Sequence, residues 1–280
     1  MKSNFHFSEQ KTSAEVAITI NRRPKGRPKE TKVLLEQTLE KMRTMKLHQM
    51  ARSLEERLAR ADHQDLTVTE VLGLVIDDEW TARENAKLEA RLRGAKFKEK
   101  TACLEDVDYK SNRGLKKQTM LELGQFKWIE KKQNVALTGP SGAGKSYLAQ
   151  ALGHSACRKG YRVIYVRMPK LLTALGQARA DGSYANLLKR LERAQVLILD
   201  DLGLSELRET ERRDLLEIIE DRYDVGSTVI TSQLAIKDWH PYFGAGRAAD
   251  SLCDRLVQNC HRIELLPQAE SQRKARAQLD

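Results

Sequence analysis

The sequence has few cysteines, few aromatic residues and no long apolar run, and these shortages exclude several classes of protein. Its four cysteines are scattered without a C-x-x-C pair, which argues against a disulfide framework or a zinc site and predicts reduced thiols in a cytoplasmic protein. The six histidines form no pair at metal-ligand spacing. No apolar run reaches the roughly 18 residues of a membrane span, and the N-terminus lacks the apolar segment of a signal peptide. We therefore expect no membrane association.

Acidic residues are also fewer than basic ones. The chain has 280 residues with 49 Lys and Arg against 39 Asp and Glu, a net charge of +10. A basic balance favours polyanionic partners, nucleic acid first. Nucleotide-binding proteins are often basic for general reasons, so charge alone leaves DNA binding open. The length suits one large domain or two smaller ones, and the 40% hydrophobic content suits a globular core.

The most specific motif is a phosphate-binding loop over residues 139–146, which matches G-x-x-x-x-G-K-[ST]. An apolar run precedes it at 135–137, and a helix-compatible run follows at 147–152. Glycines let backbone amides turn toward phosphate oxygens, and the helix N-terminus adds positive charge. Lys145 can reach the β- and γ-phosphates, and Ser146 can hold Mg²⁺. The predicted nucleotide-binding residues are Gly139, Pro140, Ser141, Gly142, Ala143, Gly144, Lys145, Ser146 and Tyr147.

The region before this loop reads as a basic arm and a small helical domain. Residues 1–32 have little apolar periodicity, and we expect a disordered arm. Around Arg27, the sequence Gly-Arg-Pro resembles the core of an AT-hook, in which the arginine enters the DNA minor groove; a solvated basic tail is the alternative. Apolar spacing predicts a helix over 33–60 and a second from a capping box at Thr67 and Glu70 to about Arg93. We expect 33–103 to be a helical domain for DNA binding and assembly.

A cluster of cations surrounds Phe97 at the end of this domain. It could follow a phosphate backbone, with Phe97 stacking or packing, or it could be a solvated helix end. The candidate DNA contacts here are Arg91, Arg93, Lys96, Lys98 and Lys100.

Residues 104–266 are predicted to form an α/β domain, followed by a polar tail over 267–280. A helix is expected over 115–132. From Asn134 strands alternate with helices, which predicts a central parallel sheet flanked by helices. The expected strands, after the run at 135–137, are 161–166, 196–199, 228–231 and 261–265. The expected helices are 145–158, 169–179, 184–194, 208–223 and 248–258.

Two acids follow the fully apolar strand at 196–199, in the pattern of a Walker B motif. Asp200 would hold Mg²⁺, and Asp201 would polarise the attacking water as general base; a strand end with solvated acids is the alternative. Ser232, at the end of the next strand, is the candidate sensor of the γ-phosphate. Arg255 precedes the last strand and could act in trans as an arginine finger. An ion pair within the chain, with Asp254 or with another surface acid, is the other reading of Arg255.

Together these motifs resemble the IstB-type transposition helper ATPases, relatives of DnaC-type helicase loaders within the AAA+ class. The resemblance rests on residues 139–149, on the Asp-Asp-Leu-Gly sequence at 200–203, on 229–233 and on 254–263, and it covers about 33–266. It implies an AAA+ P-loop fold without a C-terminal lid domain, ATP and Mg²⁺ as ligands, and hydrolysis assisted by Arg255. It also implies a ring or spiral of subunits on duplex DNA and a cognate transposase as partner. Ser141, Ala143 and Ser146 stand where Pro, Thr and Thr are usual.

Three other functions stay open at this point. A helicase loader has the same fold, and a small-molecule kinase has the same phosphate loop, although no acceptor-binding insert is evident. A DNA-bound scaffold that binds ATP without hydrolysing it is the third. Pull-downs with a helicase or a transposase, DNA-stimulated phosphate release and stimulation by a metabolite separate these functions.

Overall fold

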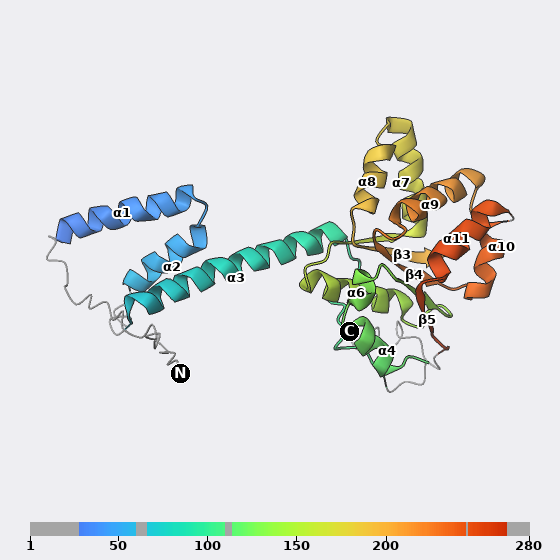
Figure 1. Ribbon diagram of the computed structural model, residues 1–280, viewed down its shortest axis with the longest axis horizontal. Helices are drawn as coiled ribbons and strands as arrows, with labels where there is room; N and C mark the ends of the chain where they lie inside the picture. The colour runs from blue at the N-terminus through green and yellow to red at the C-terminus, as the bar shows by residue number, and fades with distance from the viewer. Residues whose placement is uncertain (1–27, 60–65, 110–113, 245, 268–280) are drawn as a thin grey trace, which may run out of the picture. The chain divides into compact units, whose positions relative to one another are not determined.

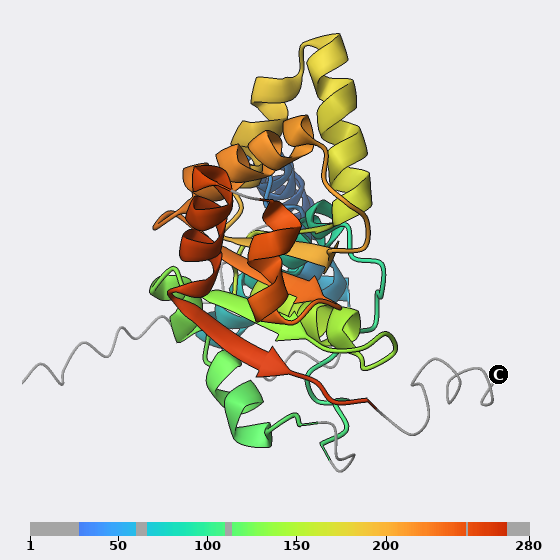
Figure 2. The same ribbon diagram turned by 90° about the vertical axis from the view of Figure 1, so that its right-hand side faces the viewer.

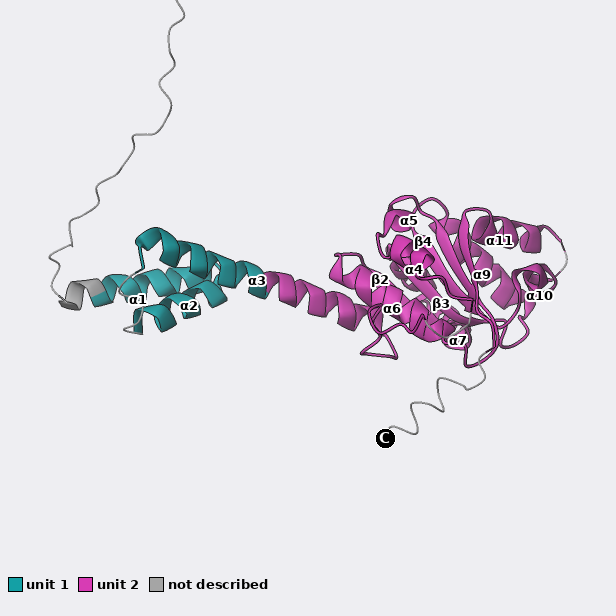
Figure 3. Cartoon of the chain, turned by 90° about the horizontal axis from the view of Figure 1, so that it is seen from below, with its two compact units in different colours: residues 1–82 teal, residues 83–280 magenta. Residues whose placement is uncertain are grey.

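The computed structural model describes residues 28–59, 66–109, 114–244 and 246–267 (Figure 1). The chain forms two compact units, residues 1–82 and 83–280, whose boundary falls inside helix α3 (Figure 3). Residues 1–27 of the expected arm, which include Arg27, lie outside the described residues. So does most of the expected tail, and the absence of a lid domain after the last strand therefore stays a prediction.

The first unit contains α1 (Pro28–Thr44), α2 (His48–Ala59) and the first part of α3 (Val68–Ala95). Helix α1 begins at Pro28, where a proline suits the first helical turn because its missing N–H has no helical partner there. The prediction of a disordered arm was therefore wrong for residues 28–32, which are helical. The prediction of one helix over 33–60 was wrong. The chain breaks at Lys46, which has the left-handed φ of 60°, and α2 then starts in a new direction.

Side chains of α3 fix α2 against it. The Glu79 carboxylate is buried and accepts hydrogen bonds from the backbone N–H groups of Gln49 and Met50, both at 2.9 Å. N–H groups in the first turn of a helix have no partner within the helix, so Glu79 stabilises this end of α2 by accepting from them. Asp78 accepts a hydrogen bond from Ser53 Oγ at 2.5 Å. The predicted capping box at the start of α3 is confirmed, because Thr67 N–H donates to Glu70 Oε2 at 2.7 Å and Glu70 N–H to Thr67 Oγ1 at 3.3 Å.

The second unit is built on a five-stranded parallel sheet in the order β2-β3-β4-β1-β5. Its strands are β1 (Asn134–Thr138), β2 (Val163–Arg167), β3 (Val196–Leu202), β4 (Ser227–Ser232) and β5 (Cys260–Glu264). Figure 2 shows β5 at one edge of the sheet, and β2 forms the other. The parallel sheet predicted from the sequence is confirmed.

Helices cover both faces of this sheet. Along β3, Val196 and Ile198 pack into one core together with α6, whereas Leu197 and Leu199 pack into the other together with α7 and α9. Both faces are therefore buried, as the unbroken apolar run of β3 predicted. The helices are α4 (Lys117–Leu123), α5 (Lys127–Glu130), α6 (Lys145–Arg158), α7 (Met168–Asp181), α8 (Tyr184–Glu192), α9 (Glu209–Arg222), α10 (Trp239–Phe243) and α11 (Arg247–Val257), with a 3-10 turn at Ile236–Asp238.

Two parts of the helical pattern differ from expectation. The single helix over 115–132 is replaced by α4 and α5, because the chain turns at Phe126, whose φ is 60°. The Phe126 ring is nevertheless buried, and the turn brings Trp128 into the same core. Helix α10 and the turn before it were not predicted. Among the described residues, no helix has both the length and the apolar character that crossing a bilayer requires.

Candidate nucleotide-binding site

The phosphate loop connects the end of β1 to the start of α6, at the carboxyl edge of the sheet where α/β proteins place ligands. Gly139, Gly142 and Gly144 all have positive φ, at 138°, 83° and 89°. A Cβ on Gly139 would lie 2.2 Å from the backbone oxygen of Leu265. Leu265 in turn donates its N–H to Thr138 O at 2.8 Å. The chain after β5 therefore lies against the start of the loop, and only glycine fits there.

Lys145, the first residue of α6, bends back over this loop. Its Nζ donates to the carbonyl oxygens of Gly139 and Pro140, both at 2.8 Å, and the residue is only 7% exposed. The ammonium group is thus placed at the loop before any phosphate binds. Ser146 follows at the same helix end and is partly exposed, as a metal ligand must be.

Asp200 is held in the sheet by its two neighbouring strands. It is 2% exposed, and its two carboxylate oxygens accept hydrogen bonds from the Tyr165 hydroxyl of β2 at 2.7 Å and the Thr231 hydroxyl of β4 at 2.6 Å. Burial and the nearby Asp200 charge raise the pKa of Tyr165 above its ordinary range, so this hydroxyl stays a donor. Each carboxylate oxygen has a second lone pair and can still accept another contact.

Asp201 sits at an irregularity of β3. The register of β3 against β4 shifts between Leu199 and Leu202, and Asp201 takes a left-handed φ of 64°. Its backbone N–H donates to Thr231 Oγ1 at 2.9 Å, and its carboxylate accepts from Arg167 Nε at 2.8 Å. That hydrogen bond also raises the pKa of the Arg167 guanidinium. The bulge therefore separates the two acids, directing Asp200 to Tyr165 and Asp201 to Arg167.

Ser232, the candidate sensor, is fully buried and bonded to backbone atoms. Its hydroxyl donates to Leu202 O at 2.7 Å and accepts from Leu234 N–H at 3.0 Å. The hydroxyl that contacts both acidic residues belongs to Thr231, one position earlier. The turnover of Ser232→Ala and Thr231→Val distinguishes which of the two hydroxyls senses the γ-phosphate.

Arg255 lies in the last turn of α11 and forms an ion pair with Glu220 of α9, at 3.3 Å between Nη2 and Oε1. The acid that pairs with it is therefore Glu220 and not Asp254, as in the surface ion pair that was the alternative reading, and the Tyr223 ring centroid lies 5.8 Å from its guanidinium. The backbone of this turn is anchored to β1, because Asn134 Nδ2 donates to Arg255 O at 2.9 Å. The strand that leads into the phosphate loop thus also fixes the position of Arg255.

The segment after α3 is bonded directly to α6. Gln150, which is 1% exposed, accepts from the N–H groups of Lys98 and Glu99 at 2.8 Å each and donates to Ser146 O at 3.1 Å. Tyr147, predicted as a nucleotide contact, bonds through its hydroxyl to the backbone N and O of Cys103 at 3.3 Å. Residues 98–103 are therefore connected to the residue predicted to hold Mg²⁺.

Phe97 and the surrounding cations have different environments. The Phe97 ring stacks on His154, with 4.1 Å between ring centroids, and packs against the core beside α6. The ring is partly buried in this packing, which favours the packing interpretation of Phe97 over stacking on a nucleic-acid base. Lys96, Lys98 and Lys100 are exposed. Of the other candidate DNA contacts, Arg93 pairs with Glu89 at 3.5 Å and Arg91 lies 3.5 Å from Cys157 O.

The residues present fit ATP and Mg²⁺. The loop offers a glycine cradle and a placed ammonium, which suit phosphate. Ser146 and Asp200 offer two oxygen ligands, and Mg²⁺ commonly takes one or two protein oxygens in addition to phosphates and water. Among the described residues no cluster of three or more His, Cys, Asp or Glu could hold a metal by itself, so the nucleotide would have to complete the coordination. All four cysteines are free, as predicted.

Sequence reasoning missed Tyr165, Arg167 and Gln150. Tyr165 and Arg167 fall in or next to an expected strand, and their role depends on β2 lying beside β3 with Arg167 opposite Asp200. Strand order could not be read from the motifs. Gln150 is a polar residue one turn after Ser146, and a buried polar residue at that position is the signal that could have identified it.

Comparisons with known proteins identify a family of ATP-binding proteins. The family model described as IstB-like ATP binding protein matches residues 40–279. A relative named as an insertion-sequence ATP-binding protein, y4pL of Sinorhizobium fredii, is 48% identical over 83% of this chain and 95% of its own length. A second relative, named as a putative ATP-binding protein of the insertion sequence IS1162 from Pseudomonas fluorescens, is 43% identical over 72% of this chain and 87% of its own length. The crystal structure of DnaI aligns with a TM-score of 0.52 at 21% identity, over 63% of this chain and 93% of that one. This likeness and the sheet order show an AAA+ P-loop fold.

Proposed function

Because this chain belongs to the family of IstB-like ATP binding proteins, we propose that it is an ATPase that assists the transposase of an insertion sequence. It assembles on duplex DNA as a homo-oligomer with ATP between subunits, and hydrolysis regulates engagement of the target. The observation that carries the catalytic part is the pair Asp200 and Asp201. Their carboxylates are held by different side chains at the sheet edge where the phosphate loop lies.

In hydrolysis, the backbone of residues 139–144 and Lys145 bind and orient the phosphates. Mg²⁺ held by Ser146 and Asp200 would neutralise charge on the β- and γ-phosphates. Asp201 accepts the proton of the attacking water, and for this it must exchange its contact with Arg167 for one with water. The two side chains of that ion pair are 37% and 22% exposed, so separating them costs on the order of 1 kcal/mol. Binding events can supply this much free energy.

Arg255 is proposed to contact the γ-phosphate held by a neighbouring subunit. Its pair with Glu220 is a single contact at 3.3 Å, and both side chains are partly exposed, at 29% and 45%. Such a pair contributes little stability, and the guanidinium can therefore leave it for a phosphate. We propose that Arg255 stabilises charge developing during phosphoryl transfer.

DNA is proposed to bind through phosphates and without reading sequence. The exposed cations after α3 and the basic arm supply charge, and the hydrogen bonds from residues 98 and 99 to Gln150 connect this segment to Ser146. A shift of the segment on DNA would thus reach the metal ligand. The relatives' association with insertion sequences supports a transposase as partner.

Assembly on DNA tests this proposal. Electron microscopy of the protein with duplex DNA should show oligomers with ATP and few without it, and Lys145→Ala should abolish the ATP-dependent ones. Arg255→Ala should keep ATP binding and lower turnover at least tenfold, because one transition-state contact is lost. Arg247→Ala at the other end of the same helix, where the residue is exposed, is the control and should turn over normally. Oligomers that persist unchanged in Lys145→Ala would show that ATP does not control assembly.

A further inference from the structure

A basic groove lies on the second unit, away from the phosphate loop. Its volume is about 650 Å³, and it lies between the end of α3, the start of β2 and helix α8. Five of its lining residues are cations, and none of the described lining residues is acidic. The cations are Arg91, Arg162, Lys189, Arg190 and Arg193. We call this surface the α3–α8 groove.

Four of these cations are not neutralised within the chain. Arg162, Lys189, Arg190 and Arg193 are exposed, and within the described residues no carboxylate lies at ion-pair distance from any of them. Helix α9 shows the contrast. There Arg208 at the N-cap and Arg212 and Arg213 within the helix each pair with a glutamate of α9, at 2.6, 2.7 and 3.2 Å. Basic residues near the C-terminal end of α8 also interact favourably with the helix dipole. That effect does not account for Arg162 and Arg91, which come from other elements.

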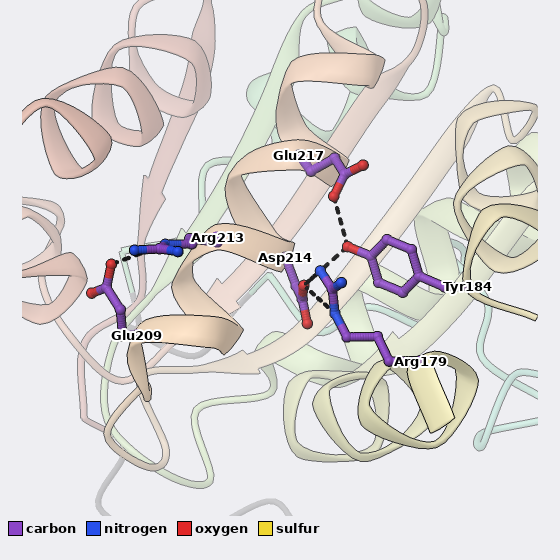
Figure 4. Close-up of polar contacts among 6 residues, drawn as sticks. All are labelled: Arg179, Tyr184, Glu209, Arg213, Asp214 and Glu217. Atoms are coloured by element: carbon purple, nitrogen blue, oxygen red, sulfur yellow. Dashed lines mark hydrogen bonds and ion pairs between the residues drawn. The ribbon is translucent and has the colours of Figure 1, made fainter. Parts of the chain in front are cut away.

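The walls of the groove are rigid. Buried Arg222 donates to the carbonyl oxygens of Leu191 at 2.6 Å and Ala194 at 2.7 Å, which fixes the end of α8. At the other end of α8, the Tyr184 hydroxyl lies 2.9 Å from Asp214 Oδ1, and Arg179 of α7 binds the same carboxylate (Figure 4). Because α8 is held at both ends, the backbone positions that carry its cations are fixed relative to the sheet.

The start of β2 is also held by hydrogen bonds. Arg162 N–H donates to Gln195 Oε1 at 2.9 Å, and Arg162 O accepts from Val196 N–H at 3.1 Å. On the α3 side, Gly94 has open space where a side chain would stand. The backbone of a ligand can therefore approach α3 closely at this point.

We propose that the α3–α8 groove binds the phosphate backbone of duplex DNA. The long side chains that line it carry only donors, and phosphate oxygens only accept, so the lining matches a phosphate better than a mixed protein surface. Arg162 stands at the start of β2, whereas the phosphate loop follows the opposite, carboxyl ends of the strands. The groove is therefore separate from the nucleotide site. This inference rests on the proposed function, since it assigns a surface to the proposed DNA.

The test compares two triple variants of the full chain. The groove variant is Arg162→Gln, Lys189→Gln and Arg193→Gln. The control is Lys117→Gln, Lys127→Gln and Lys131→Gln, which removes three equally exposed charges near α4 and α5. Duplex DNA binding is measured as a function of salt. Each lost phosphate contact lowers the slope of log K against log[salt] by about 0.9. We therefore expect the groove variant to lose about 2.7 in slope and roughly 100- to 500-fold in affinity near 0.1 M salt, while the control keeps the wild-type slope.

Two further measurements exclude misfolding and test whether positive charge alone is enough. ATP binding and the unfolding temperature should match wild type in both variants, because the substituted side chains are exposed. Arg162→Lys with Arg193→Lys should retain most DNA binding, since a point charge satisfies a phosphate oxygen.

The results separate the two proposals. A groove variant that binds DNA like wild type overturns the groove and leaves the proposed function intact. Loss of affinity with an unchanged salt slope also overturns it, because phosphate contacts must change that slope. Normal DNA binding with lost binding to polyglutamate would assign the groove to an acidic protein segment instead. If wild type itself fails to bind duplex DNA, both proposals fall.

Discussion

Replacing Gly139 with alanine tests the packing of the phosphate loop against the chain after β5. The added Cβ would lie 2.2 Å from Leu265 O, and it must retreat by about 0.8 Å to reach even the 3.0 Å limit for such contacts. The φ of 138° adds backbone strain for an L side chain. The loop can relieve the contact only by moving, and a displacement of about 1 Å at a binding site can cost roughly 100-fold. We expect ATP affinity to fall by that order.

Alanine variants at two other glycines distinguish the effect of the close contact with Leu265 O from that of backbone strain at positive φ. Gly182 also has positive φ, 78°, but an added Cβ would meet nothing within 4 Å, and Gly176 has open space inside α7. Gly182→Ala should lower stability by about 1 kcal/mol through strain alone. Gly176→Ala should raise it by roughly 0.5–1 kcal/mol, because alanine favours helix. Gly139→Ala should cost about 2–4 kcal/mol, since overpacking adds to strain.

The assays are thermal unfolding for all three variants and titration with ATP. At about 2–4 °C per kcal/mol for a unit of this size, the changes in unfolding temperature are measurable. Gly176→Ala and Gly182→Ala should bind ATP like wild type. The reasoning is refuted if Gly139→Ala binds ATP normally with an unfolding temperature no lower than that of Gly182→Ala.

Three further predictions concern stability and turnover. Arg222→Met leaves buried carbonyls without donors and should cost roughly 3–5 kcal/mol in urea unfolding; a loss below about 1 kcal/mol would contradict it. Burial lowers the pKa of His154, so the unfolded chain binds more protons than the folded one, and the free energy of unfolding should fall as the pH drops below about 6.5. His154→Gln should remove this pH dependence. An unchanged dependence of the unfolding free energy on pH would exclude His154 as its source. Thr231→Val should lower turnover by about 10- to 100-fold through the lost hydrogen bond to Asp200, whereas Ser232→Ala should leave it largely unchanged; the reverse outcome would identify Ser232 as the sensor.

The motifs predicted the centre of the fold because their chemistry dictates local structure. Helix α6 has the expected bounds, since the phosphate loop requires a helix to begin at Lys145. The apolar run at 196–199 could only be a strand buried on both faces. The helix breaks at Lys46 and Phe126 were missed because left-handed residues that are not glycine leave no signal in an apolar pattern.

Contacts between elements could not be predicted, because they depend on strand order and register. Thr231 contacts both acids only because β3 bulges between Leu199 and Leu202. Glu220 rather than Asp254 meets Arg255 because α9 and α11 pack together. Local sequence around Arg255 contains no trace of that packing.

We propose that this chain couples ATP hydrolysis to the binding of duplex DNA. The most direct measurement is the rate of phosphate release with and without duplex DNA, in wild type and in Asp201→Asn. We expect DNA to stimulate phosphate release by wild type. Asp201→Asn should still bind ATP but release little phosphate in either condition. A rate indifferent to DNA, or release of similar speed by Asp201→Asn, would contradict it.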